Sequence, residues 1–200
     1  MKTALSILGI LFGIFILLQL YISMSIFKTE QQKYSVISTD GDMEIRFYPS
    51  ATLATIRMDV KSYKELSSPG FRKLAGYIFG GNTAAKQIPM TAPVHMDIQD
   101  TGSSMSFVMP DQYDTGNLPE PKDSTIILEK TKDEYVAAIR FGGYASDQKI
   151  RENTEKLVKI LKEKAIAHQG NFRFLGYNPP YQLLGRRNEV IVSIEWNKNK

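Results

Sequence analysis

The sequence predicts an α+β fold in which a β-β-α-β-β unit occurs twice, so that two pseudo-twofold related halves form one domain. Several segments alternate apolar and polar residues with the period of two that is typical of half-buried strands. Two longer segments carry apolar residues at helical spacing, one in each half. The sequence from Leu53 to Met58 reappears as Val136 to Phe141, an offset of 83 residues from Ala54 to Ala137. These observations together predict the duplication.

The first copy is predicted to contain a long helix between two pairs of strands. The strands are expected at 43–48, 50–60, 94–98 and 104–109. The helix runs from Ser62 to Ile78, and Ser67-Ser68-Pro69-Gly70 is expected to split or kink it, because proline removes a helical donor and glycine adds backbone freedom. Its second half carries an apolar stripe: Phe71, Leu74, Ala75 and Ile78.

The second copy repeats this order. Its strands are expected at 125–130, 135–141, 172–177 and 189–196. Its helix runs from Asp147, a plausible N-cap, to about His168, with a dense charged face opposite the apolar one. The order predicts a mostly antiparallel sheet.

The N-terminal segment is set apart by its composition. Between Lys2 and Lys28 lie 25 residues without a charged side chain, enough for a helix that spans a bilayer core. We expect residues 1–28 to form a transmembrane anchor; a cleaved signal segment ending near Ser23-Met24-Ser25 is the alternative. The flanking charges then place the domain outside the cytoplasm. Residues 29–35 are predicted to be a polar linker and 36–197 the folded domain.

The amino-acid composition argues against several classes of function. Hydrophobic residues make up 42% of the chain and charged residues 23%, as in a globular domain. The net charge of +4 is spread along the chain rather than clustered, so no nucleic-acid partner is predicted. Because cysteine is absent, disulfides, thiolate metal sites and thiol catalysis are excluded.

The two histidines offer little for metal ligation. His95 alternates with Val94 and Met96 in a strand, so it is expected to face solvent; axial ligation of a haem and a polar packing role are the minor alternatives. His168 is expected at a helix end. No spacing of histidines and carboxylates predicts a metal site.

No catalytic motif stands out, although some charged residues could meet in the fold. Glu44, Asp97 and Glu189 are carboxylates on predicted strands, and a buried one could serve a small hydrolase. Arg186 and Arg187 precede the last strand, where they could bind a ligand or bridge the halves through Glu189 or Glu195.

Three ordered blocks between Tyr34 and Trp196 resemble the SOUL haem-binding protein family. The first combines Phe71-Arg72-Lys73-Leu74-Ala75-Gly76-Tyr77-Ile78-Phe79-Gly80-Gly81-Asn82 with Lys86-Gln87-Ile88-Pro89-Met90-Thr91-Ala92-Pro93-Val94. The second is Arg140-Phe141-Gly142-Gly143-Tyr144-Ala145, and the third runs from Gly176-Tyr177-Asn178-Pro179-Pro180 to Val190. The resemblance implies a distorted eight-stranded antiparallel barrel with two helices, a unit that also resembles bacterial effector-binding domains.

The resemblance also implies a function and a site. It implies non-enzymatic binding of haem or another tetrapyrrole in a shallow apolar cleft between the first long helix and the Pro-Pro loop. Carried over by motif, the cleft residues are Phe71, Leu74, Ala75, Ile78, Pro180, Tyr181, Leu183, Leu184 and Arg186. The helix stripe could instead simply pack on the sheet. Other open functions are a pocket for another flat hydrophobic molecule, a small hydrolase with a buried carboxylate, and a ligand-free protein-interaction module.

Overall fold

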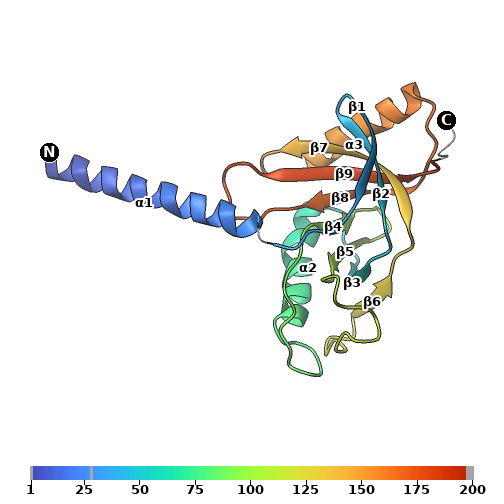
Figure 1. Ribbon diagram of the computed structural model, residues 1–200, viewed down its shortest axis with the longest axis horizontal. Coiled ribbons are helices and arrows are strands. Elements are labelled where there is room, and N and C mark those ends of the chain that lie inside the picture. The colour runs from blue at the N-terminus through green and yellow to red at the C-terminus, as the bar shows by residue number, and fades with distance from the viewer. Residues whose placement is uncertain (1, 28, 197–200) are drawn as a thin grey trace.

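A computed structural model describes residues 2–27 and 29–196 of the chain, without the side chains of 2–5 and 20–27. It contains three helices and nine strands within this range (Figure 1). The elements are α1 (Lys2–Phe27), β1 (Ser35–Asp40), β2 (Met43–Tyr48), β3 (Thr52–Met58), α2 (Tyr63–Ile78), β4 (Val94–Asp97), β5 (Ser103–Val108), β6 (Ile126–Lys130), β7 (Glu134–Gly142), α3 (Asp147–Glu163), β8 (His168–Gly176) and β9 (Arg187–Ile194).

The strands form one antiparallel sheet with the order β1-β2-β7-β9-β8-β4-β5-β3-β6. Strand β1 lies outside the duplication. Each remaining strand of the first copy has a counterpart in the second: β2 with β6, β3 with β7, β4 with β8 and β5 with β9. Exchanging every strand for its counterpart reverses the strand order of the sheet, as a twofold axis requires. The predicted pseudo-twofold α+β fold is therefore confirmed, with the axis between β8 and β4.

The register preserves the offset found in the sequence. Ala54 pairs with Leu128, and Ala137 pairs with Ile45. The shift of 83 residues that takes Ala54 to Ala137 thus also takes Ile45 to Leu128. The two alanines occupy equivalent places on equivalent strands, as the duplication predicts.

Strand number and closure require a correction. The sheet has nine strands rather than eight, because β1 pairs with β2 outside the duplicated unit, and no pairing of β1 with β6 closes the sheet in the described part of the chain. All residues of β1 are exposed, so its sequence carries no buried face that alternation could reveal.

Helix α2 is continuous through the segment predicted to split it. Pro69 lies inside the helix, and Ser62 caps its start by accepting a hydrogen bond from the Glu65 N–H. Gly70 is buried against the sheet: a Cβ there would lie 3.1 Å from Met105 Cε and 3.4 Å from Ile56 Cδ1. The glycine therefore lets the helix approach β3 and β5 closely instead of breaking it.

Two glycines of α2 should respond in opposite ways to alanine. Gly70→Ala should lower the free energy of unfolding by about 1 kcal/mol, since it overpacks against the fully buried Met105. Gly76→Ala should raise it by about 0.5 to 1 kcal/mol, because its Cβ would meet open space and alanine favours the helix. Urea unfolding of both variants measures the difference, and equal effects would contradict the close packing at Gly70.

Helix α3 begins and ends differently from the prediction. Ser146, not Asp147, is the N-cap, since its backbone is extended and its Oγ accepts from the Lys149 N–H. The helix ends at Glu163, and Ala165 has a positive φ of 52°. His168 is therefore not at the helix end but opens β8, where its exposed ring lies 5.0 Å from that of Phe172.

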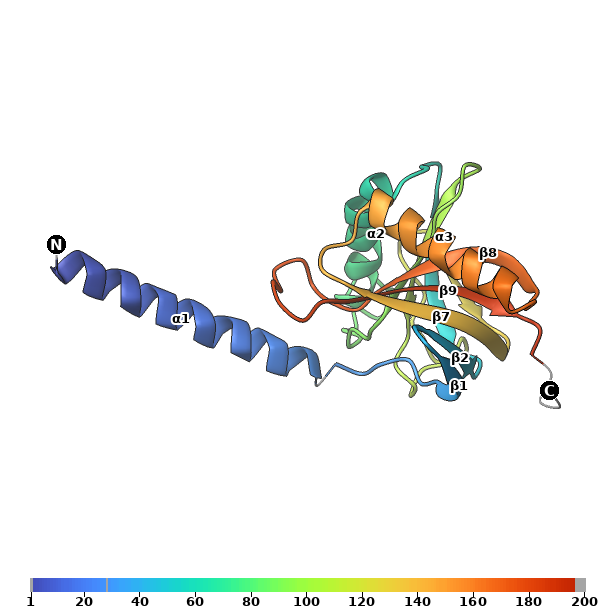
Figure 2. The same ribbon diagram turned by 90° about the horizontal axis from the view of Figure 1, so that it is seen from above.

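The sheet is buried on both faces. Helix α2 packs on β3 and β5 and α3 on β7, β8 and β9, with apolar clusters between (Figure 2). A third apolar cluster lies on the opposite face and consists of Tyr48, Ala92, Val136, Ala138, Leu175, Tyr177 and Ile191. A strand residue that points away from the helices is therefore not necessarily exposed.

The segment predicted as a linker packs on this second face. Gln32 donates its backbone N–H to the Ala92 carbonyl, and Ala92 donates to the Glu30 carbonyl. The Tyr34 ring lies 5.1 Å from that of Tyr48. Residues 30–34 are thus a packed strap of the domain rather than free chain.

The predicted anchor, residues 1–28, lies partly outside what the structure describes. Residues 1 and 28 are not described, and neither are the side chains of residues 2–5 and 20–27. Over what is described, no helix is long and apolar enough to cross a membrane.

Candidate functional site

The loop between β8 and β9, residues 178–186, is held in one shape by its own polar groups. The Arg186 guanidinium donates to the carbonyl oxygens of Pro179 at 2.6 Å and Gln182 at 2.8 Å. Asn178 Nδ2 donates to Gln182 Oε1 at 2.7 Å, and Gln182 Nε2 donates to the Leu184 carbonyl at 2.8 Å. These bonds fix the loop from inside, so its tip does not need a ligand to be ordered.

The apolar side chains of this loop point outward. Tyr181 is 62% exposed, Leu183 45% and Leu184 75%, and Pro180 is also exposed. Single exposed apolar residues are common, but three within four positions of a braced loop form a patch. This patch is the exposed loop side of the predicted cleft.

The helix side of the predicted cleft requires a correction. Leu74 and Ile78 are 0% and 1% exposed and belong to the core under α2. Ala75 is half-buried against the same core. Phe71 lies edge-on against Phe107 of β5 but is 37% exposed. Leu74 and Ile78 face the sheet because they share the face of the helix that is packed inward, whereas Phe71 lies at its exposed edge.

The loop also lies beside a different part of the molecule than expected. The Tyr144 hydroxyl donates to the Pro180 carbonyl at 3.2 Å, and the Arg186 guanidinium lies 4.3 Å above the Tyr144 ring. Burial raises the pKa of Tyr63 at the start of α2, and the nearby Arg186 charge opposes that shift. Phe71 lies eight residues further along α2, about 12 Å at the rise of a helix. The Leu183 N–H also donates to Gln19 Oε1 of α1 at 3.3 Å. The loop therefore neighbours the β7–α3 turn and α1, and its Arg186 lies within electrostatic reach of Tyr63, rather than beside the predicted stripe.

Arg186 has a structural role of its own. It binds backbone carbonyls of the loop rather than the carboxylates considered from the sequence. Its Nε is buried and has no hydrogen-bond partner among the described residues. The guanidinium is thus largely committed to shaping the loop.

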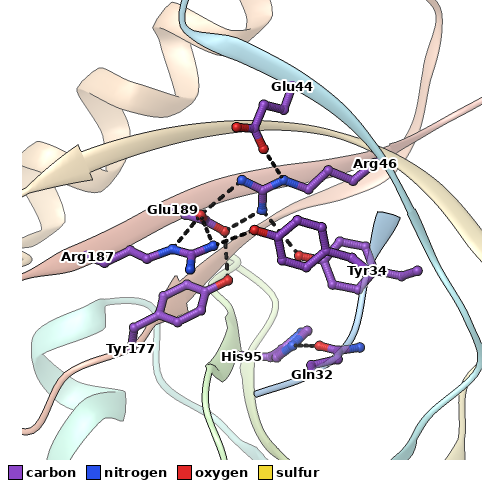
Figure 3. A network of polar contacts seen from close by, with 9 residues as sticks. Gln32, Tyr34, Glu44, Arg46, His95, Tyr177, Arg187 and Glu189 are labelled. Atoms are coloured by element: carbon purple, nitrogen blue, oxygen red, sulfur yellow. Dashed lines mark hydrogen bonds and ion pairs between the residues drawn. The ribbon is translucent and has the colours of Figure 1, made fainter. Parts of the chain in front are cut away.

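A second polar cluster lies on the opposite face of the sheet, centred on Glu189 (Figure 3). Glu189 is 0% exposed and accepts from Arg46 at 2.7 and 3.1 Å. Arg187 donates to Glu189 Oε1 at 2.9 Å, and the Tyr177 hydroxyl donates to Oε2 at 2.8 Å. The strap joins this cluster through Tyr34, whose hydroxyl accepts from Arg187 at 2.9 Å. Arg187 pairs with Glu189, but both lie on β9, so this pair does not bridge the halves as expected; Arg46 of β2 connects Glu189 to the first half.

The charges of this cluster compensate one another. Burial alone would raise the pKa of Glu189, but the hydrogen bonds and charge of Arg46 and Arg187 outweigh it and hold the pKa below its ordinary value. Burial, assisted by the Glu189 charge, raises the pKa of the Tyr177 phenol far above its usual range. Both oxygens of Glu189 are engaged, so this carboxylate offers neither a free lone pair to a cation nor a proton to a substrate.

His95 requires a further correction, because it is buried rather than solvent-facing. It is 7% exposed, and its Nε2 lies 2.7 Å from Gln32 Oε1 of the strap. Burial, with a smaller effect from the Arg173 charge, lowers the pKa of His95 to about 3. The neutral ring is enclosed between sheet and strap, on the face opposite the helices.

Other concave and acidic features lie away from the loop. One groove of about 560 Å³ surrounds Arg57, Asp97 and Gly102, and another of about 310 Å³ lies beside the strap at Lys33 and Ala51. Neither contains a residue of the predicted cleft. No group of three or more histidine, aspartate or glutamate side chains that could hold a metal occurs in residues 2–27 and 29–196 as described.

Fold and site define a single α+β domain built from a duplicated unit, with a braced apolar loop at one end. A family model described as SOUL heme-binding protein matches residues 29–193. The chain belongs to the SOUL haem-binding protein family.

Curated relatives agree with this assignment. The chain is 31% identical over 158 residues to heme-binding protein 2 of Mus musculus, covering 75% of this chain and 77% of that one. It is 29% identical over 154 residues to heme-binding protein 1 of Xenopus laevis, covering 74% and 80%.

Solved structures share the fold at low identity. The EcmrR C-terminal domain superposes with a TM-score of 0.57 at 12% identity, covering 82% of this chain and 99% of that one. A hydrolase from Listeria innocua superposes with a TM-score of 0.54 at 9% identity, covering 86% and 97%. These likenesses concern the fold alone.

Proposed function

We propose that this protein binds haem or another tetrapyrrole without catalysing a reaction, and that the tip of the 178–186 loop is the main contact. Membership in the SOUL family supports the ligand class. The observation that carries the site is the exposed patch of Tyr181, Leu183 and Leu184 on a loop braced by Arg186. A flat apolar macrocycle is bound best by a preformed apolar surface.

The residues around the loop tip fit such a ligand. Tyr181 and the half-exposed Tyr144 offer aromatic faces, and Leu183 and Leu184 offer aliphatic contact. When bound, haem supplies an iron centre and two carboxylates on a flat apolar ring. The protein's part is to bind and orient the ring.

Axial ligation by histidine does not fit this site. His95 is enclosed on the opposite face, and His168 opens β8 at the end away from the loop, eight residues or about 26 Å of strand before Gly176. We therefore expect the haem to be held mainly by apolar contacts.

Truncating the loop tip should weaken haem binding. Tyr181→Ala and Leu183→Ala should each raise the dissociation constant about tenfold, because burial of each side chain contributes roughly 1.5 kcal/mol. Absorbance titration of the full-length chain with haem measures this. Ile127→Ala, which truncates a comparably exposed side chain on β6, is the matched control and should leave the affinity unchanged. Unchanged affinity in both loop variants would place the ligand elsewhere.

The hydrolase alternative is not favoured by the buried carboxylate that suggested it. Glu189 is paired with Arg46 and Arg187 and bonded to Tyr177, so it fits a structural cluster better than a general acid or base.

An extracytoplasmic, membrane-anchored location remains a proposal. It is supported by the uncharged run between Lys2 and Lys28. Recovery of the full-length, uncleaved chain in the soluble fraction after cell lysis would reject it.

A further inference from the structure

A ligand that carries carboxylates needs a cation beside the apolar loop. Arg186 is the nearest guanidinium in the sequence, but its Nη1 and Nη2 donate to the loop carbonyls of Asn178, Pro179 and Gln182, and its unpaired Nε is buried. Its face is also stacked on Tyr144. Arg186 therefore positions the loop and has little capacity left to bind an anion.

Lys149, in the first turn of α3, is an exposed cation beside the β7–α3 turn. Its Nζ lies 3.0 Å from the place that a Cβ on Gly143 would occupy, so the ammonium reaches back over the β7–α3 turn. Gly143 has a positive φ of 77° and no side chain, which leaves that position open. The next residue, Tyr144, is the one whose hydroxyl bonds the loop at Pro180.

The ammonium of Lys149 is not neutralised by a neighbouring acid. Lys149 is exposed and takes no part in the ion pairs found between described residues. Asp147, the acidic residue closest in sequence, is turned toward α2, where its carboxylate accepts the N–H groups of Tyr63 at 2.6 Å and Lys64 at 3.3 Å. A positive charge thus remains available beside an apolar patch.

Two of the three basic residues of α2 are placed less well. The third, Lys64 in the first turn, is exposed and takes part in no ion pair between described residues. Lys73 is bound to Asp123 at 3.2 Å and to Thr125 at 3.1 Å. Arg72 is exposed, but it lies nine residues along α2 from Tyr63, about 13 Å at the rise of a helix. Arg72 therefore lies farther along α2 from Tyr63, the residue on which the Arg186 charge acts.

We propose that Lys149 binds a carboxylate of the ligand and makes the site selective for flat apolar molecules that carry an acidic group. The ligand then lies across Tyr181, Leu184 and Tyr144, between the β8–β9 loop and the β7–α3 turn, which run side by side in both views (Figures 1 and 2). This inference rests on the proposed function and adds the residue that sets its specificity.

The test compares haem with the dimethyl ester of haem, which keeps the flat ring and its iron but lacks the free carboxylates. Full-length wild type, Lys149→Gln, Lys149→Arg and Arg72→Gln are titrated with both by fluorescence quenching or absorbance. Lys149→Gln should weaken haem binding roughly five- to tenfold, the loss expected for one charge-assisted hydrogen bond at an exposed site, and leave the ester unaffected. Lys149→Arg should restore haem affinity, and Arg72→Gln should match wild type.

Three other outcomes would reject either the role of Lys149 or the proposed function. Unchanged haem affinity in Lys149→Gln, with wild type binding, rejects the role of Lys149 while leaving the proposed function standing. Equal weakening by Lys149→Gln and Arg72→Gln shows general attraction to a basic surface and also rejects it. Failure of wild type to bind either porphyrin rejects the proposed function itself.

Discussion

Replacing Glu189 with glutamine should lower the free energy of unfolding by about 3 to 5 kcal/mol. The substitution keeps the shape of the side chain but leaves Arg46, which is 3% exposed, without its carboxylate partner. Removing one partner of a buried ion pair lowers the free energy of unfolding by this amount because the remaining charge stays desolvated. Urea denaturation followed by circular dichroism measures the loss.

The exposed ion pair between Lys156 and Asp42 provides the control. The two side chains are 50% and 69% exposed, and exposed pairs contribute about 0 to 1 kcal/mol. Asp42→Asn should therefore change the stability little. Should Glu189→Gln cost no more than Asp42→Asn, the Glu189 cluster does not hold the strap face together.

Acid should destabilise the protein through His95. The pKa of His95 is lowered to about 3 in the folded state from 6.5, so the unfolded chain binds a proton that the folded chain excludes. The stability that His95 contributes is fully present above pH 6.5 and is lost as the pH falls toward 3. Between pH 7.5 and pH 5 this loss amounts to about 2 kcal/mol.

Other groups also titrate, so the effect is isolated by a substitution. His95→Gln retains a polar side chain that can bond Gln32 but cannot be protonated. Its stability should fall by about 2 kcal/mol less than that of wild type over the same pH range. Parallel pH profiles for the two proteins would show that His95 is accessible to protons in the folded state.

Local patterns predicted the strands and the duplication well. Met43–Tyr48 is a strand at the predicted residues, and the repeat at 54 and 137 reappears as matching registers. These features depend on period and internal similarity, both of which a single sequence contains. The family resemblance added the curled sheet, which periodicity alone does not determine.

Local patterns could not predict which residues are buried on the face of the sheet opposite the helices. Alternation shows which residues share a face of a strand, but not whether the other face is covered. His95 and Arg46 were on the side away from the helices, and a sheet curled under the strap buries both. Arg46 and Glu189 lie 143 residues apart, so nothing local in the sequence joins them.

The site was predictable only in part for a related reason. The apolar loop residues could be carried over by motif, and they are exposed at the surface. The apolar stripe of α2 was ambiguous, because a stripe that faces a ligand and one that faces the core have the same spacing. Packing against β3 and β5 assigns Leu74 and Ile78 to the core and leaves Phe71 partly exposed.

Hydrogen–deuterium exchange of the full-length chain with and without haem tests the central proposal most directly. Binding at the loop predicts slower exchange in peptides that cover 178–186 and 142–149, with no change at the strap, residues 30–34, or at 92–97 around His95. Protection centred on the strap and His95 instead, with the loop unchanged, would contradict the proposed site.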